Sequence, residues 1–394
     1  MKLTYLMWGY PYDDAIIRAL KAVGFIVNTV TLPEELIYDW KSVSDIQPGR
    51  RRENTFGQSL SYLKEQFRTK AGDIIFSVNF FAQVSNLCKQ EEIPYCSWVL
   101  QLPDFDLYTA AVKNECNYVA VCDSYLVEKL WQLGVSRAFF LPDAIELKEP
   151  VKDVVIEREC CFVAKHPGQC LKTGKMTMYG KGYLDAFIHA QRVLYGAYIL
   201  EDGLLRRVQQ EFLACNSVPE VVLPEVVLPE MRRLFMADCF FAPVCTGLQQ
   251  SIFLQNFDSI MTIYSDGSFP HCKAEKRSFP ETEEERRAVY AGKEFTLVLA
   301  PHNLHNGIPR EMLEIIAAGG FPISGFQKDY NYFFKMNENL VYFTNSAEFK
   351  QAIMRYGNSY EERERVRTAA FQTVMEGHTY QQRIISMLEI WGKL

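Results

Sequence analysis

Short apolar runs alternate with helical segments along most of this chain, and the runs are apolar throughout rather than at every second residue. Six of them lie in the amino-terminal part, at residues 3–8, 25–32, 73–79, 94–100, 117–123 and 137–141. Five more follow at residues 160–164, 260–265, 295–300, 321–324 and 340–344. Continuously apolar strands must be buried on both faces, and helices between the strands supply that cover. The pattern therefore predicts an α/β protein with two Rossmann-like domains, parallel sheets and a cleft between them.

The boundaries of these domains follow from length and local composition. The chain has 394 residues, more than one hydrophobic core usually holds, so we expect two domains. Residues 146–157 are charged and contain Pro150, as in an inter-domain connection, which places the first domain at residues 1–150. In the second domain, residues 183–256 read as helical around the interruption VPEVVLPEVVLPE. The polar segment 265–294 is expected to be a surface loop.

Composition excludes several classes of protein. A content of 48% hydrophobic and 23% charged residues is typical of a globular protein, and the net charge of −6 argues against a nucleic-acid partner. The Arg run at residues 50–52 is expected to be a solvated loop. Eleven cysteines without a C-x-x-C pair predict reduced thiols. No apolar run has the length of a signal-peptide core or of a membrane span, so we expect a cytoplasmic protein.

Motifs for common cofactors and nucleophiles are absent from the sequence. It has no G-x-G-x-x-G after the first strand, no P-loop and no G-x-S-x-G elbow. His302 and His305 stand three residues apart near a strand end, where turn residues near a cleft are favoured over a metal site. Three strands end in Asn79, Gln101 and Asp123, which either face the cleft or cap turns.

The most informative stretch is GIPREMLEIIAAGGFPIS, which begins at Gly307. Pro309 suits the first turn of a helix, and the two glycines after Ala318 predict its end. Arg310 and Glu314 then share one edge of the helix while apolar side chains face the sheet. Glu314 is either half of a surface ion pair or a carboxylate that accepts hydrogen bonds from the paired hydroxyls of a ribose. In the second case, backbone N–H groups near Gly307 can receive a phosphate.

Several segments carry a resemblance to a known family. They are DIIFSVNFF, IPYCSWVLQLPD, NYVAVCD, GYLDAFIHAQRVLYG, GIPREMLEIIAAGGFPISGFQKDYNYFF and EERERVRTAAFQTVMEGHTYQQRIISMLE. With these segments the chain resembles, over most of its length, GT-B glycosyltransferases of the spore-maturation (CgeB) type. Its carboxyl half is similar to the group-1 sugar transferases. The turn GGFPI and the closing H-T-Y-x-x-R are the most specific matches.

The resemblance implies a GT-B fold and a transferase that takes a nucleotide sugar as co-substrate. The second domain, residues 151–377, would hold the donor, the first would hold a glycan or protein acceptor, and residues 378–394 would form a helix that crosses back to the first domain. The implied donor contacts are Glu314, Arg310, Gly307, Gly319, Gly320, Asn303 and Lys165, the last of which could equally be an exposed loop lysine. The resemblance also implies retention of the anomeric configuration without a bound metal or other cofactor. Asp123, Glu311 and His302 are candidates for a catalytic base by location.

Three departures from the family pattern favour an alternative. Asn306 stands where related transferases carry a further Glu, Arg310 and Glu311 displace the usual Arg position, and Gln101 replaces an Asp. These changes suit a catalytically inactive GT-B protein that binds a nucleotide or a partner transferase. A GT-B epimerase would need catalytic carboxylates that the sequence does not reveal. Residues 231–257, rich in aromatic residues, could form core, a dimer face or a membrane-surface contact, and core is favoured.

Overall fold

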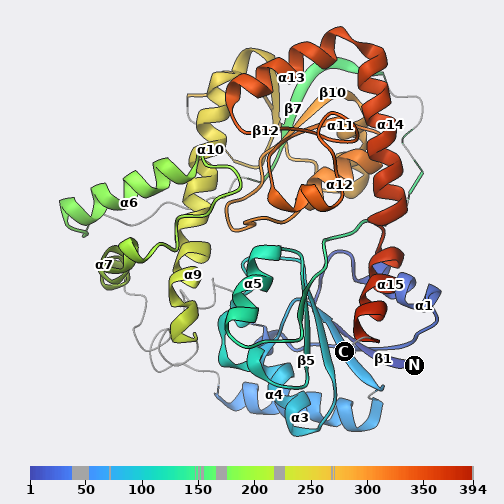
Figure 1. The fold of residues 1–394 in the computed structure, drawn as a ribbon. Helices are drawn as coiled ribbons and strands as arrows, with labels where there is room; N and C mark the ends of the chain where they lie inside the picture. The colour runs from blue at the N-terminus through green and yellow to red at the C-terminus, as the bar shows by residue number, and fades with distance from the viewer. Residues whose placement is uncertain are drawn as a thin grey trace.

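Two parallel six-stranded sheets form two lobes in the computed structural model, one below the other in Figure 1. The structure describes residues 1–37, 53–70, 72–146, 148–149, 151, 155–165, 175–216, 227–267, 269 and 271–392. The Arg run at 50–52, the segment 166–174 and most of the VPEVVLPEVVLPE repeat lie outside the described residues. The prediction of an α/β fold with two Rossmann-like domains is confirmed.

The first lobe is built on the sheet β2-β1-β3-β4-β5-β6. Its strands are β1 (Lys2–Met7), β2 (Ile26–Thr31), β3 (Ile74–Val78), β4 (Tyr95–Val99), β5 (Asn117–Val121) and β6 (Ala138–Phe140). Its helices are α1 (Asp13–Ala22), α3 (Glu53–Lys70), α4 (Ala82–Gln90) and α5 (Ser124–Gln132). Every residue of β3 and β4 is buried, which is why these runs are apolar throughout.

The second lobe is built on the sheet β12-β11-β10-β7-β8-β9. Its strands are β7 (Glu157–Val163), β8 (Met261–Tyr264), β9 (Glu275–Arg277), β10 (Lys293–Val298), β11 (Pro322–Gly325) and β12 (Val341–Phe343). The helices after β8 are α11 (Glu283–Ala291), α12 (Arg310–Ala317), α13 (Ser346–Asn358) and α14 (Tyr360–Gly377). Both faces of this sheet carry buried apolar clusters.

The prediction of a surface loop at residues 265–294 was wrong over two segments. β9 and α11 both lie there. β9 is an edge strand of the sequence Glu-Lys-Arg whose three residues are all exposed, so it lacks the apolar signal of its neighbours. α11 begins with a capping box in which Thr282 and Glu285 satisfy each other's backbone N–H groups.

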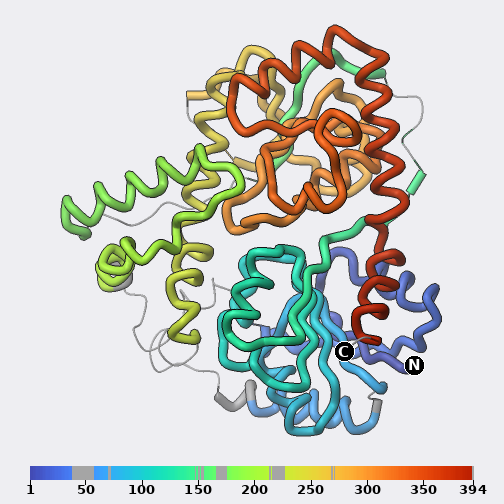
Figure 2. The backbone as a smooth tube through the Cα atoms, viewed as in Figure 1, coloured from blue at the N-terminus to red at the C-terminus, as the bar shows by residue number. Residues whose placement is uncertain are grey.

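A long helical crossover joins β7 to β8. It contains α6 (Met178–Gln191), α7 (Arg206–Asn216), α9 (Arg232–Met236), a π-helical turn (Ala237–Phe241) and α10 (Ala242–Asn256). The traces in Figures 1 and 2 show α6, α7 and α9 on the flank of the two lobes. The ring of Phe235 packs edge-on against Phe105 and Tyr108 of the first lobe, with centroids 5.3 and 5.5 Å away. The apolar side chains of the segment 231–257 are thus largely core, as the favoured alternative had it.

The chain returns to the first lobe at its carboxyl end. After α14, helix α15 (Tyr380–Trp391) runs beside α1, and the two termini lie near each other (Figure 2). Its buried side chains Tyr380, Ile384 and Met387 join the apolar cluster under the first sheet. Ile145 and Thr379 form a parallel β-bridge where the two connecting segments pass each other.

We predict that Gly320→Ala destabilises the fold by about 1–3 kcal/mol, as overpacking of a filled core does. A Cβ at Gly320 would lie 2.6 Å from the Tyr290 carbonyl oxygen, and backbone at the end of α11 cannot rotate away. Gly182→Ala is the matched control, because a Cβ there meets nothing within 4 Å and should stabilise α6 by about 0.5–1 kcal/mol. Denaturant midpoints measure both, and equal midpoints for the two variants would contradict the close approach of α11 and α12.

Candidate functional site

Helix α12 carries Glu314 at the junction of the two lobes. The helix begins after Pro309, and Met312, Leu313, Ile315 and Ile316 are buried in the second lobe. Glu314 points instead toward the first lobe, where the Tyr12 hydroxyl donates a 2.7 Å hydrogen bond to its Oε1. Its side chain keeps 14% of its surface exposed. The charge inside this apolar helix is therefore neither buried in the core nor directed into open solvent.

Arg310 lies one turn before Glu314 and joins four parts of the chain. Its Nε donates to Glu314 Oε1 at 2.9 Å. Its Nη1 donates to Asp143 Oδ1, the Ala144 carbonyl and the Tyr380 hydroxyl at 2.7–3.0 Å. The Arg310–Glu314 pair, which the sequence suggested as a surface ion pair, is thus part of a larger and mostly buried polar cluster. Removing one member of such a cluster would cost about 3–5 kcal/mol because it leaves a charge buried without its partner.

The guanidinium of Arg310 also lies 3.5 Å from the centroid of the Tyr12 ring. Burial alone would lower the pKa of Arg310, but the carboxylate of Asp143 and the other groups around it raise it well above its ordinary value. This arginine is therefore permanently charged, and a cation over an aromatic face in a partly desolvated site adds to the attraction between the lobes.

A cavity that is partly open to solvent lies beside Glu314. Its lining residues are Tyr12, Ile145, Glu146, Glu283, Arg286, Arg287, Tyr290, Arg310, Glu314 and Ala317. Two of its carboxylates are paired elsewhere, Glu146 with Arg18 at 2.6 Å and Glu283 with Lys148 at 2.8 Å. The arginines thus give one wall of the cavity a positive character next to a single acidic group.

The two carboxylate oxygens of Glu314 have different partners. Oε1 accepts from both Tyr12 and Arg310, whereas the nearest cation to Oε2 is Arg286 Nε at 3.7 Å, beyond hydrogen-bond range. A carboxylate oxygen can accept two hydrogen bonds, so Oε2 can still receive hydroxyl groups.

Asp123 lies between β5 and α5 of the first lobe and bridges to the loop that precedes α12 in the second lobe. It caps α5, with its Oδ1 accepting from Tyr125 N at 2.9 Å. Its Oδ2 accepts from the consecutive backbone N–H groups of His305, Asn306 and Gly307 at 2.6, 3.1 and 3.3 Å. The N–H groups that the sequence suggested for a donor phosphate are thus occupied by a carboxylate of the first lobe.

Asp123 is a poor catalytic base in this arrangement. It is fully buried, and although burial alone would raise its pKa, His305 and the N–H groups of Asn306 and Gly307 hold the pKa below its ordinary value. A carboxylate with its oxygens engaged and a lowered proton affinity cannot take a proton from an acceptor hydroxyl. The expectation that Asp123 is a catalytic base was therefore wrong: its carboxylate links α5 of the first lobe to residues 305–307 of the second.

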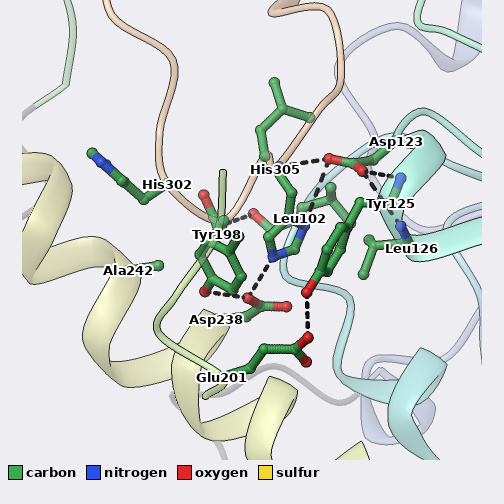
Figure 3. Close-up of polar contacts among 12 residues, drawn as sticks. Leu102, Asp123, Tyr125, Leu126, Tyr198, Glu201, Asp238, Ala242, His302 and His305 are labelled. Atoms are coloured by element: carbon green, nitrogen blue, oxygen red, sulfur yellow. Dashed lines mark hydrogen bonds and ion pairs between the residues drawn. The ribbon is translucent and has the colours of Figure 1, made fainter. Parts of the chain in front are cut away.

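His305 and Asp238 form a buried network that the sequence did not reveal (Figure 3). His305 Nε2 lies 2.8 Å from Asp238 Oδ1, and its Nδ1 lies 3.6 Å from Asp123 Oδ2. Asp238 also accepts hydrogen bonds from the hydroxyls of Tyr108 and Tyr198, at 2.6 and 2.7 Å. Burial would lower the pKa of His305, but the two carboxylates raise it to about 10. The imidazolium is thus a fixed cation between two anions.

The π-helical turn explains why Asp238 can reach this position. Ala237–Phe241 widens the helical register between α9 and α10, and such insertions often accompany functional side chains. The His305 ring lies between Tyr125 and Tyr198, with centroids 4.6 and 4.2 Å away. The only sequence signal was the pair His302 and His305, which gave no hint of a partner in the crossover.

Neither of the other two candidate bases lines the Glu314 cavity. His302 lies apart from the network in Figure 3, its Nδ1 is 3.3 Å from Thr246 Oγ1, and burial lowers its pKa to about 4. Glu311 is not among the residues that line the cavity, and burial together with the nearby charge of Glu314 raises its pKa to about 8. Glu311 Oε1 has no hydrogen-bond partner among the described residues.

The glycines and the remaining donor candidates have structural roles here. A Cβ at Gly307 would lie 2.7 Å from the Cys122 carbonyl oxygen, so this glycine lets the lobes touch. Gly319 has φ +86° and ends α12, and a Cβ at Gly320 would lie 2.6 Å from the Tyr290 carbonyl oxygen. Asn303 donates to the Leu102 carbonyl of the first lobe at 2.7 Å. Lys165 is exposed and paired with Glu281 at 3.1 Å, which favours the loop alternative.

Two further observations concern the described residues only. No group of three or more His, Cys, Asp or Glu side chains among them is placed to hold a metal ion. None of the helices that the structure describes is both long enough and apolar enough to cross a bilayer.

At the strand ends, Asn79 Oδ1 accepts from the N–H groups of Leu100 and Gln101, so it shapes a turn.

Two parallel sheets facing each other, with the last helix returning to the first, define the GT-B class of fold. Residues 261–389 match the family described as glycosyl transferase-like, which covers α12 and Glu314. No protein of curated function matches the sequence.

Solved structures with the same fold cover the whole chain at low identity. Anabaena HepE in complex with UDP and glucose has 7% identity, covers 100% of both chains and gives a TM-score of 0.50. A trehalose-6-phosphate synthase analysed with bisubstrate glycomimetics has 11% identity, covers 100% of this chain and 99% of that chain, and gives 0.51. The amino-terminal domain of Candida albicans trehalose-6-phosphate phosphatase has 9% identity, covers 99% and 96%, and gives 0.51.

We predict that His305→Gln destabilises the protein most at low pH. The unfolded histidine releases its proton near its ordinary pKa of 6.5, whereas the folded one holds it to about pH 10. The stabilisation is therefore complete below pH 6.5 and is lost as the pH rises toward 10. Near pH 6 the variant should lose about 3–5 kcal/mol of unfolding free energy, as expected for a broken buried ion pair.

His302→Gln is the matched control, with the opposite sign. Because burial lowers the pKa of His302 to about 4, the wild-type protein loses stability as the pH falls from 6.5 to 4, and the variant should gain relative to it. Denaturant titrations between pH 4 and pH 9.5 measure both. A constant difference between His305→Gln and the wild type across this range would contradict the charged network.

Proposed function

We propose that this protein is a glycosyltransferase that binds a nucleotide sugar in the cavity beside Glu314 and transfers the sugar to an acceptor hydroxyl. The observation that carries the proposal is Glu314 itself, a carboxylate with a spare oxygen at the junction of two Rossmann-like lobes. The match of residues 261–389 to glycosyl transferase-like domains supports it, as does the fold shared with a HepE structure that contains UDP and glucose.

The donor would use the groups that the cavity already positions. Paired ribose hydroxyls would donate to Glu314 Oε2, while Oε1 stays bonded to Tyr12 and Arg310. The diphosphate would lie against Arg286 and Arg287, which line the same cavity. This placement differs from the expectation at Gly307, because Asp123 already occupies those N–H groups. Arginine side chains give charge-assisted and often bidentate contacts to phosphate oxygens.

The transfer would rely on stabilising the leaving diphosphate. Two guanidinium groups beside the departing oxygen would offset its developing charge in a partly closed site, without a bound metal. An inverting transfer needs a side-chain base on the acceptor hydroxyl. Of the candidates, Asp123 is saturated, His302 faces another cavity and Glu311 stays protonated up to about pH 8. We therefore propose a retaining transfer.

The resemblance to the spore-maturation (CgeB) type adds finer points to the proposal. A protein of this kind would work in the cytoplasm on an envelope or spore polysaccharide or on a protein glycan.

An inactive GT-B protein that binds a nucleotide or a partner transferase is the second candidate. The observation in its favour is that Asp123 fills the N–H groups of residues 305–307, where the sequence had suggested a donor phosphate. Release of nucleoside diphosphate from UDP-, GDP-, ADP- and CDP-sugars decides between the two. Release from any one donor supports the transferase, and nucleotide binding without release from any donor supports the inactive protein.

We predict that Glu314→Gln weakens nucleoside diphosphate binding by about ten- to a hundredfold. The substitution removes a charged acceptor, and hydrogen bonds to ionised groups contribute about 1.5–3 kcal/mol. Isothermal titration with UDP, GDP, ADP and CDP measures the affinity for each nucleotide.

Glu311→Gln is the matched control on the same helix. Its carboxyl is already protonated near neutral pH because burial raises its pKa to about 8, so the amide should leave nucleotide affinity unchanged. Equal affinities for the wild type and Glu314→Gln would remove the ribose assignment. A loss in the control as large as that in Glu314→Gln would show that both act through the fold.

A further inference from the structure

A second cavity, partly open to solvent, is lined in part by the loop that leads into α12. It lies at the carboxyl ends of β10 and β11. The segment after α6, the middle of α10 and the loop after β10 form its walls. Ala197 and Pro301 are exposed lining residues, so the cavity reaches solvent there. In open α/β sheets, ligands collect at this end of the strands.

The lining of this cavity has no unpaired charged side chain that could bind an ionic ligand. None of its residues is Asp, Glu, Lys or Arg, in contrast to the arginine-lined cavity beside Glu314. His305 is cationic, but its Nε2 is already held by Asp238 at 2.8 Å. His302 is neutral near pH 7 because burial lowers its pKa to about 4. A phosphate or carboxylate would therefore be desolvated without a partner, which is costly.

Amide side chains supply oriented hydrogen-bonding groups. Gln249 Nε2 donates to the Arg192 carbonyl at 3.0 Å, and Gln327 Nε2 donates to the Leu304 carbonyl at 3.2 Å. The Gln249 side chain also interacts with the Tyr195 hydroxyl. Each amide carries a carbonyl oxygen with two lone pairs, which can accept from a hydroxyl group. The lining therefore suits a ligand that is rich in hydroxyl donors.

Aromatic rings form the apolar part of the wall. Tyr195, Tyr198 and Phe326 line the cavity, and two of these rings pack directly on glycine backbone. A Cβ at Gly196 would lie 2.9 Å from the Phe326 ring, and one at Gly325 would lie 2.7 Å from the Tyr195 ring. Aromatic rings with a few fixed polar groups are typical of small-ligand sites.

We propose that this cavity binds a neutral saccharide unit, through hydroxyls that donate to Gln249 and Gln327 and C–H faces that lie on the aromatic rings. The assignment of that saccharide as part of the acceptor rests on the proposed function, and it differs from the expected acceptor site on the first domain because every lining residue lies between 191 and 327. The binding itself does not, because the cavity shares no lining residue with the one beside Glu314. A nucleobase is flat and neutral as well, so the test includes uridine as an opposing arm.

The experiment is a saturation-transfer NMR titration of the full chain. The probes are the methyl glycosides of glucose, galactose, mannose and N-acetylglucosamine, with uridine as the competitor. Ala300→Leu fills the cavity from the end of β10, and Gln327→Ala removes one acceptor. At least one glycoside should bind the wild type, and each variant should weaken it by about tenfold, as for a lost hydrogen bond or excluded ligand volume. Gly182→Ala is the control and should leave glycoside affinity unchanged, because Gly182 lines neither cavity and a Cβ there meets nothing within 4 Å.

Three results would overturn the proposal: no glycoside binds, uridine displaces the glycoside completely, or Gln327→Ala and Ala300→Leu both bind it as the wild type does. A circular-dichroism melt establishes that each variant is folded, and Gln327→Ala decides the question should Ala300→Leu fail to fold. Titration of the same variants with UDP, GDP, ADP and CDP separates the two proposals. Glycoside binding without binding of any of these nucleotides would leave this site in place and remove the proposed donor site.

Discussion

The side chain of Arg310 connects the parts of this molecule that must lie together for a site to exist. One guanidinium contacts Asp143 and Ala144 of the connection, Tyr380 at the start of α15, Tyr12 of the first lobe and Glu314 on its own helix. The two lobes have separate sheets, but an apolar cluster joins the crossover helices to the first lobe. The polar contacts of Arg310 add to this packing on the side of the connection and α15. Because the polar cluster is mostly buried, each charge needs its partner, and the geometry around Glu314 is held as a unit.

The loop between β10 and α12 is held against the first lobe by hydrogen bonds to Asp123. Its N–H groups at residues 305–307 are bound by Asp123, so the loop is fixed against the first lobe rather than open to an anion. One cavity of the structure contains three arginines and Glu314, and the other contains amides, aromatic rings and His305, whose charge is already paired with Asp238. The diphosphate of a donor would lie against arginines in the first cavity. A neutral saccharide would form hydrogen bonds with amides in the second. Arg310 and Glu314 of α12 line the first cavity, and residues of the loop that leads into α12 line the second.

The sequence carried most of the fold and part of the site, for physical reasons that particular residues illustrate. Strands such as β3 and β4 were predictable because burial on both faces forces an apolar run, whereas β9 was missed because its three residues are exposed on an edge. Glu314 stood out because a charge inside an apolar, glycine-terminated helix needs a partner. The network of Asp123, Asp238 and His305 could not be read, because its members are 67 to 182 positions apart and meet only after the crossover packs on the first lobe. The expectation that the Gly307 N–H binds a phosphate was wrong for the same reason: this N–H donates to Asp123, which belongs to the other lobe and is distant in sequence.

A crystal structure of the protein soaked with a mixture of UDP, GDP, ADP and CDP tests the central claim most directly. The account predicts density for one nucleotide between the lobes, with ribose hydroxyls within hydrogen-bond distance of Glu314 Oε2 and the diphosphate against Arg286 and Arg287. A nucleotide bound elsewhere on the protein, with Glu314 still bonded only to Tyr12 and Arg310, would contradict it.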